Sequence, residues 1–348
     1  LVDARGMYIV PGFVCMHAHG GGGHDFTECT EEAFRTAIAA HMKHGATSFF
    51  PTLSSSPFSE IRKAVDICEK LMAEPDSPIL GLHVEGPYLN RKMAGEQFAN
   101  QVKEVDVAEY TSLLESTDCI KRWDASPELP GALDFARYLK SKGIVGAVSH
   151  TEAEYDEIKA AYAVGFSHAA HFYNAMPGFH KRREYKYEGT VESVYLTDGM
   201  TVEVIADGIH LPATILKLVY KLKGVENTCL VTDALAYAAY EGNEPIDPRY
   251  IIEDGVCKMA DHSALAGSLA TMDVLVRTMV KKANIPLEDA VRMASETPAR
   301  LIGVSDRKGA LAKGKDADIV ILDKELNVRC VWSMGKIVPG TDILLHKE

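Results

Sequence analysis

The chain has 348 residues, of which 47% are hydrophobic and 25% are charged, and its formal net charge is −12. These values are typical of a globular enzyme with room for one large barrel and a small appendage. They argue against a nucleic-acid-binding protein, which needs a basic surface stripe, and against a membrane protein, because no apolar run approaches the roughly 20 residues of a spanning helix.

The cysteines and the first residues bear on the cellular compartment. Seven cysteines are scattered along the chain, odd in number and never in a C-x-x-C pair, which favours reduced thiols over a disulfide framework. Residues 1–6 have neither the basic start nor the apolar stretch of a signal peptide. We therefore expect a soluble, cytoplasmic protein.

In chain order, short apolar strands alternate with amphipathic helices. Residues 58–72 carry apolar side chains at i, i+3 and i+4 spacing, which predicts a helix, and residues 154–163, 212–222, 268–282 and 286–294 follow the same pattern. The eight predicted strands cover residues 13–17, 47–52, 79–85, 119–124, 144–149, 166–172, 201–206 and 228–233.

This alternation predicts an α/β fold, a parallel (β/α)8 TIM barrel. It disfavours an open doubly wound sheet, since no G-x-G-x-x-G opens a helix. We expect the barrel over residues 11–300 and a small β-sandwich-like domain built from the chain ends, residues 1–10 and 301–348. A β domain of so few strands would leave its edge strands exposed. We therefore expect that the N-terminal half of this small domain precedes Leu1 and is missing.

Side chains that can bind a metal stand where five of the predicted strands end. Barrel enzymes hold their reactive groups at these C-terminal ends, so we expect the side chains to converge on one axial cavity. Imidazoles with carboxylates are typical ligands of Zn, Fe or Mn, with positions left open for water. The residues in question are His17, His19, Glu85, His150, His171 and Asp233.

The other histidines have a structural interpretation. His83 points the same way as Glu85 but lies deeper, which favours core packing, and His168 has the opposite strand parity to His171. H-x-H alone is a weak motif, and Asp233 alone could cap a helix. The histidines without a strand-end position, expected at the surface or in loops, are His24, His41, His44, His180, His262 and His346.

Several short segments form a recognisable series along the chain. They are PGF before HAH at 11–19, HVEGP at 83–87, SHT at 149–151, HFYNAM at 171–176, ADGIH at 206–210, TDA at 232–234 and LAGS at 265–268. In matching order over about residues 10–338, the series resembles the N-acetylglucosamine-6-phosphate deacetylases of the amidohydrolase superfamily. Many relatives in the superfamily bridge two metals with a carboxylated lysine on strand four, whereas this sequence offers Glu85 on strand three, as the deacetylases do.

The resemblance implies a metal-dependent hydrolysis of N-acetyl-D-glucosamine 6-phosphate to D-glucosamine 6-phosphate and acetate. It implies one or two divalent ions, Zn ahead of Fe or Mn, with Asp233 as the catalytic acid and base. Glu85, His150 and His171 would bind the main ion. His17 and His19 would add a second ion, with Glu85 as the bridge.

The resemblance also implies the substrate contacts. Asn174, Ala175 and His210 match positions that grip the sugar phosphate. The arginine that the family uses for phosphate corresponds to Arg182 when positions are counted from Met176. It corresponds to Arg183 when the arginine–glutamate pair of the family is matched, so both remain candidates. In the family this site is completed across a dimer interface, which implies a homodimer. A substrate-lining loop matches Leu265, Ala266 and Gly267.

One departure concerns Glu96 and Gln97, which stand where single-metal members have a histidine. A glutamine can hydrogen-bond the substrate but cannot act as a cationic electrophile, which favours a two-metal site. Two other functions stay open. One is another amidohydrolase, dihydroorotase-like or D-aminoacylase-like, which would share the metal site without the phosphate contacts. The other is a non-catalytic barrel protein, although every catalytic position is filled.

Overall fold

The computed structural model describes residues 4, 6–95, 97, 100–242 and 244–341. Its centre is a sheet of eight parallel strands that follow one another in chain order, as the sequence predicts. Main-chain hydrogen bonds from Asp233 to His17 (3.0 Å) and from His19 to Ala234 (2.8 Å) join the last strand region to the first, so the sheet closes into a barrel. The strands are β2 (Phe13–Ala18), β5 (Ala46–Leu53), β6 (Leu82–Glu85), β7 (Ile120–Ala125), β8 (Val145–Val148), β9 (Phe166–Ala169), β12 (Thr201–Ile205) and β13 (Thr228–Val231).

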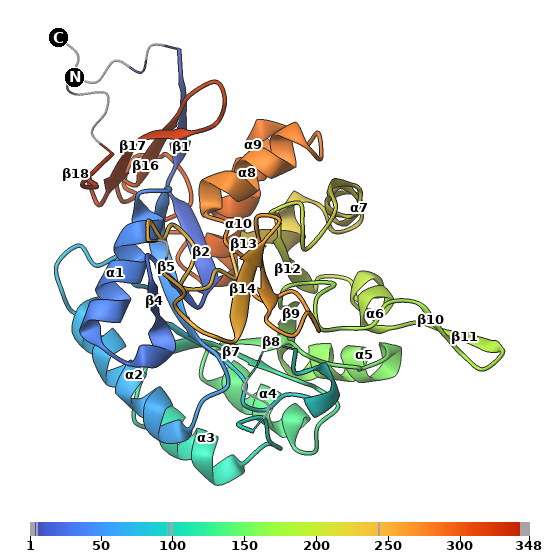
Figure 1. Ribbon diagram of the computed structural model, residues 1–348. Helices are drawn as coiled ribbons and strands as arrows, with labels where there is room; N and C mark the ends of the chain where they lie inside the picture. The colour runs from blue at the N-terminus through green and yellow to red at the C-terminus, as the bar shows by residue number, and fades with distance from the viewer. Residues whose placement is uncertain (1–3, 5, 96, 98–99, 243, 342–348) are drawn as a thin grey trace.

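Helices surround this barrel (Figure 1). Helix α2 spans the residues predicted for it, because its apolar stripe, from Ile61 to Leu71, is buried against the strands. None of the helices in the described part of the chain is both long and apolar enough to cross a membrane. The helices are α1 (Glu31–Met42), α2 (Phe58–Met72), α3 (Val107–Leu114), α4 (Ala132–Ser141), α5 (Tyr155–Val164), α6 (Thr190–Leu196), α7 (Ala213–Lys223), α8 (Met272–Lys281), α9 (Leu287–Ala294), α10 (Glu296–Leu301) and the short 3-10 helices η1 (Phe26–Glu28), η2 (Arg91–Met93) and η3 (Val225–Asn227).

The two ends of the chain share one antiparallel sheet, as predicted. Its order is β1 (Tyr8–Pro11), β16 (Ile319–Leu322), β17 (Val328–Ser333) and β18 (Lys336–Ile337), and Figure 1 shows it on one side of the barrel. The buried Lys308 ammonium donates to Asp318 at 2.6 Å, which ties the segment after α10 to this sheet.

Three further strand pairs lie outside the barrel and the end sheet. They are β3 (Gly20–Gly21) with β4 (His24–Asp25), β10 (His180–Arg182) with β11 (Tyr185–Tyr187), and β14 (Tyr250–Glu253) with β15 (Val256–Met259). The hairpin β10–β11 projects away from the barrel (Figure 1).

Four barrel strands, β8, β9, β12 and β13, end earlier than predicted, and three of them are followed by residues of the predicted metal site. His150, His171 and Asp233 each lie two residues beyond the last residue of β8, β9 and β13. Their φ angles are +45°, +26° and +46°, in the left-handed region that residues other than glycine rarely adopt. Strained backbone of this kind is concentrated at functional sites, where the surrounding structure holds it. The chain thus turns sharply at each of these residues.

Candidate metal centre and substrate cavity

Glu85, His150 and His171 form the first half of a buried polar centre. The Oε1 atom of Glu85 lies 3.2 Å from Nε2 of His150 and 2.9 Å from Nε2 of His171. The Nδ1 atoms point outward, to the carbonyl oxygens of Met93 (2.7 Å) and Asn174 (3.1 Å). A carbonyl only accepts, so each Nδ1 carries a proton, and in the neutral ring the Nε2 lone pair is directed at the carboxylate.

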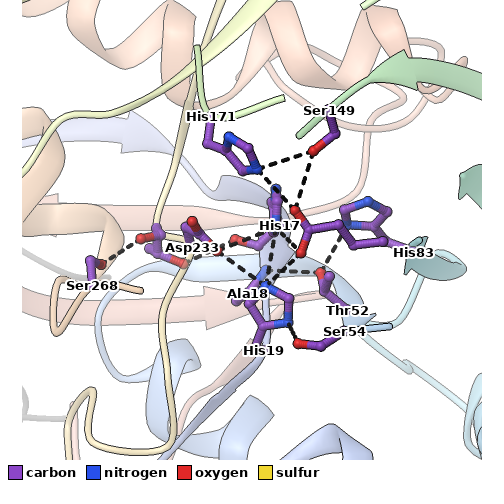
Figure 2. A network of polar contacts seen from close by, with 12 residues as sticks. His17, Ala18, His19, Thr52, Ser54, His83, Ser149, His171, Asp233 and Ser268 are labelled. Carbon is purple, nitrogen blue, oxygen red and sulfur yellow. Dashed lines mark hydrogen bonds and ion pairs between the residues drawn. The ribbon is translucent and has the colours of Figure 1, made fainter. Parts of the chain in front are cut away.

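His17 and His19 form the second half. Their Nε2 atoms lie 3.3 Å apart, and Oε2 of Glu85 lies 3.7 Å from the first and 3.2 Å from the second. The Nδ1 atom of His17 contacts Glu203 at 2.6 Å, and that of His19 contacts the Ser54 hydroxyl at 3.0 Å. In Figure 2, the side chains of His17, His19 and His171 turn toward one another.

Asp233 completes this cluster. Its Oδ1 atom lies 3.3 Å from Nε2 of His17 and 3.2 Å from Nε2 of His19 (Figure 2). Within the described residues this buried oxygen accepts no hydrogen bond of proper geometry. Burial alone would raise the pKa of Asp233, but the imidazoles of His17 and His19 hold that pKa well below its usual range. The carboxylate is therefore ionised.

These residues fit one or two divalent cations. Two groups bring their ligand atoms within 4.8 Å of one another: Glu85 with His150 and His171, and Glu85 with His17 and His19. Inward-facing lone pairs and an unsatisfied carboxylate oxygen repel one another unless a positive charge lies between them. Without a cation, a proton on His17 supplies that charge: burial opposes an imidazolium, yet Asp233, Glu203 and Glu85 raise the pKa of His17 to about 10, and a bound cation would take the place of this proton.

A cavity of about 420 Å³ opens on this centre. The structure brings the predicted substrate residues Asn174, Ala175, His210, Leu265, Ala266 and Gly267 together along its walls. Lys92, which the sequence analysis did not single out, also lines the cavity; its ammonium group lies 3.2 Å from Glu152.

His210 contributes a positive charge to the cavity wall. Its Nδ1 lies 2.7 Å from Oδ2 of Asp207, and its Nε2 lies 2.8 Å from the carbonyl oxygen of Ala266. Both partners are acceptors, so both ring nitrogens carry protons. Burial opposes this charge, but Asp207 raises the pKa of His210 above its usual value. No role was predicted for Asp207, although its position three residues before His210 is compatible with the hydrogen bond between the two side chains.

Gln97 lines the cavity, where it was expected, and it also makes a contact with the centre that was not predicted. Its amide nitrogen donates to Oε2 of Glu85 at 2.6 Å, and its carbonyl oxygen accepts from the Ser55 amide at 2.7 Å. Gln97 therefore orients the shared carboxylate and also lines the cavity. Glu96 lies outside the described residues.

Arg182 and Arg183 lie on the projecting hairpin and do not line the cavity of their own chain. Arg182 pairs with Glu154 and lies over the Tyr187 ring, 4.7 Å from its centroid. Arg183 is exposed and has a φ of +54°.

The remaining histidines are placed as follows. His83 and His168 are buried, as predicted: His83 contacts Thr52 at 3.0 Å, and burial and the nearby Arg122 lower the pKa of His83 to about 4. The prediction for His41 is wrong, because it is fully buried in α1 and contacts the Gly20 carbonyl at 2.9 Å. Its helical spacing from other buried residues was the missed signal. His346 lies outside the described residues.

A buried charged network that was not predicted lies beneath the centre. Arg122 and Asp124 on β7 and Glu203 on β12 are fully buried. The signal was available, because charged residues inside otherwise apolar strands are rare unless they pair. Asp124 lies two positions from Arg122, but Glu203 lies 81 positions away, and that contact could not be inferred from the sequence.

Comparisons with known proteins agree with this geometry. A sequence model of the amidohydrolase family matches residues 8–338. N-acetylglucosamine-6-phosphate deacetylase of Lysinibacillus sphaericus is 30% identical, over 97% of this chain and 87% of the relative, and the Homo sapiens protein of the same name is 31% identical, over 98% and 85%.

Solved structures of proteins with that name superpose closely. The Pasteurella multocida protein has a TM-score of 0.90 at 28% identity, covering 97% of this chain and 88% of its own. A mutant of the Mycobacterium smegmatis protein, in complex with N-acetyl-D-glucosamine-6-phosphate, has a TM-score of 0.88 at 32% identity, covering 95% and 86%.

Proposed function

The chain belongs to the amidohydrolase family, in the branch of the N-acetylglucosamine-6-phosphate deacetylases, and we propose that it hydrolyses the acetamide of N-acetyl-D-glucosamine 6-phosphate. The products are D-glucosamine 6-phosphate and acetate, as a step of amino sugar catabolism. The observation that carries this proposal is one cavity with an ionised Asp233 and a candidate metal centre at its floor and a cationic His210 in its wall.

The centre is proposed to hold two divalent cations, Zn²⁺ ahead of Fe²⁺ or Mn²⁺. Glu85, His150 and His171 would bind the first, and His17 and His19 the second, with Glu85 shared. Imidazole and carboxylate ligands suit these ions, whereas Mg²⁺ and Ca²⁺ prefer oxygen ligands. When bound, such a cation supplies Lewis acidity, which makes water nucleophilic near neutral pH and polarises a carbonyl.

Asp233 then moves the proton. Its carboxylate is ionised and faces the cavity, so it accepts the proton of the water that attacks the acetyl carbon. It returns that proton to the amide nitrogen as the carbon–nitrogen bond breaks, because an amide anion is too poor a leaving group to depart unprotonated.

The sugar and its phosphate would lie against the outer cavity wall. Asn174, Ala175 and the loop Leu265, Ala266 and Gly267 shape this wall, and the charge on His210 favours an anionic group beside it. This contact is local, because the chain as a whole is acidic.

We further propose a cytoplasmic homodimer in which the β10–β11 hairpin reaches the cavity of the partner. The hairpin region exposes Phe179 (61%) and Tyr185 (64%), large apolar side chains of the kind that interfaces cover. Arg182 and Arg183 lie beside them, away from their own cavity, so in a dimer they are available to the phosphate of the neighbouring site.

Replacing Arg182 and Arg183 together by alanine should raise KM for N-acetylglucosamine 6-phosphate roughly 10- to 100-fold, since a charge-assisted hydrogen bond contributes about 1.5–3 kcal/mol. The rate on unphosphorylated N-acetylglucosamine should hardly move, because that substrate lacks the group contacted. Steady-state kinetics on both substrates measure this split.

Lys186→Ala is the matched control, since it removes a cation from the facing strand of the same hairpin. An equal loss on both substrates in the arginine variant would indicate structural damage. Unchanged kinetics on the phosphorylated sugar would exclude the phosphate assignment.

A substrate panel separates the proposal from the other functions. We expect acetate release from N-acetylglucosamine 6-phosphate to exceed turnover of dihydroorotate and of N-acetyl-D-amino acids by orders of magnitude in kcat/KM. Preference for either of those would indicate another amidohydrolase activity. Turnover of none by the metal-loaded chain would indicate a binding protein.

A further inference from the structure

A carboxylate that the proposed reaction does not use lies directly beneath the candidate metal centre. Glu203, on β12, is fully buried, and its Oε1 atom lies 2.6 Å from Nδ1 of His17. The same oxygen accepts a hydrogen bond from the main-chain amide of His171 at 3.1 Å. Glu203 therefore touches residues from both halves of the centre.

Arg122 keeps this carboxylate ionised. The guanidinium donates to Asp124 at 2.8 and 2.7 Å and to Glu203 through two nitrogens, one of them at 2.9 Å. Burial alone would raise the pKa of Glu203, but Arg122 and then His17 hold that pKa well below its usual range. Arg122 contributes +1 and the two carboxylates −1 each, so these three residues together carry −1, and the Oε1 atom of Glu203 faces His17 while its Oε2 atom lies 3.2 Å from Nε2 of His168.

The contact fixes which nitrogen of His17 faces the centre. An ionised carboxylate only accepts, so Nδ1 must carry the proton, and in the neutral ring Nε2 presents its lone pair toward His19 and Glu85. A carboxylate behind a ligand histidine also raises its basicity. His150 and His171 are instead held by neutral carbonyls, and His19 by a hydroxyl.

We propose that Glu203 is a positioning residue that orients His17 and raises the basicity of its Nε2 atom for the second cation of the centre. This role rests on the two-ion centre of the proposed function. In this role Glu203 strengthens the binding of the second ion and does not contact the substrate. The first ion, held by Glu85, His150 and His171, should depend on Glu203 much less, because its imidazoles have their own acceptors.

Glu203→Gln tests this role with little change of shape. Titrating the metal-free chain with Zn²⁺ against a competing chelator should show a 10- to 100-fold weaker second equivalent, the usual effect of losing such a partner, and a nearly unchanged first equivalent. With Co²⁺ in place of Zn²⁺, the visible absorption of the second equivalent should change while that of the first does not.

Asp124→Asn is the matched control. It removes the same charge from the same Arg122 at the same burial. Among the described residues Asp124 forms ion pairs with Arg122 and His83 and none with His17 or His19, although it lies with His83 in a third group of possible ligands that His17 also joins. The role predicts that Asp124→Asn binds its second ion more tightly than Glu203→Gln. Equal weakening in both variants, or two unweakened equivalents in Glu203→Gln, would overturn it.

Glu203→Asp covers the case in which the glutamine variant does not fold. It keeps the charge that compensates Arg122 but withdraws the carboxylate from His17 by one methylene, so the second equivalent should again weaken. An unweakened second equivalent in this variant would overturn the role. A parent chain that binds fewer than two equivalents would instead overturn the two-ion centre of the proposed function, and the role with it.

Discussion

Replacing Glu85 by alanine is expected to remove bound metal and activity together. Its Oε1 contacts His150 and His171 and its Oε2 lies 3.2 Å from His19, so this one side chain belongs to both candidate metal groups. Without it, His150 and His171 face each other with no carboxylate between them, and His17 and His19 retain only Asp233. Metal analysis of the purified variant should find near zero equivalents, and acetate release should fall to background.

Glu128→Ala is a control for loss of an acidic group at the barrel mouth. Glu128 accepts hydrogen bonds from Asn90 at 2.8 Å and from the Thr151 hydroxyl at 2.5 Å, next to His150, without touching an imidazole. This variant should retain its metal. Two full equivalents in a folded Glu85→Ala chain would show that Glu85 is no ligand.

Replacing Asp233 by asparagine is expected to lower kcat about 10²- to 10⁴-fold, the usual worth of a positioned acid and base. An amide of the same shape cannot take up the proton of the attacking water or deliver it to the leaving nitrogen. The metal should largely remain, since Glu85 and the imidazoles are untouched. Steady-state kinetics and metal analysis on one preparation check both parts.

Asp207→Asn is the comparison variant for Asp233→Asn, because it also converts an aspartate to asparagine. Asp207 holds the cationic form of His210 at the cavity wall, away from the centre, so its loss should appear mainly in KM for the phosphorylated sugar. If kcat of Asp233→Asn stays within about tenfold of the parent, some other group moves the proton.

The architecture followed from local patterns in the sequence. Helix α2 was predicted over its observed residues because its buried stripe repeats at helical spacing. Strand β12 was predicted for a similar reason, because its segment is short, rich in β-branched residues and bounded by turns. The positions of His17 and Glu85 followed from parity and strand ends, which are also local properties.

The details of the site depend on contacts that no local pattern reports. The positive φ angle of His171 occurs where its main-chain amide donates a hydrogen bond to Glu203, a residue distant in the sequence. Hydrophobic periodicity does not indicate a change of backbone direction at a single residue. Arg122 meets Glu203 across 81 positions of sequence. The bond from Gln97 to Glu85 could not be predicted either, because a residue in a loop has no periodicity to indicate where its side chain turns.

Acetate release from N-acetylglucosamine 6-phosphate, measured while the metal-free chain is titrated with Zn²⁺, tests the central claim most directly. We expect no turnover without metal, a rise to a plateau at two equivalents per chain, and glucosamine 6-phosphate as the second product. Full turnover by the metal-free chain, or no acetate at any metal loading of the folded protein, would contradict it.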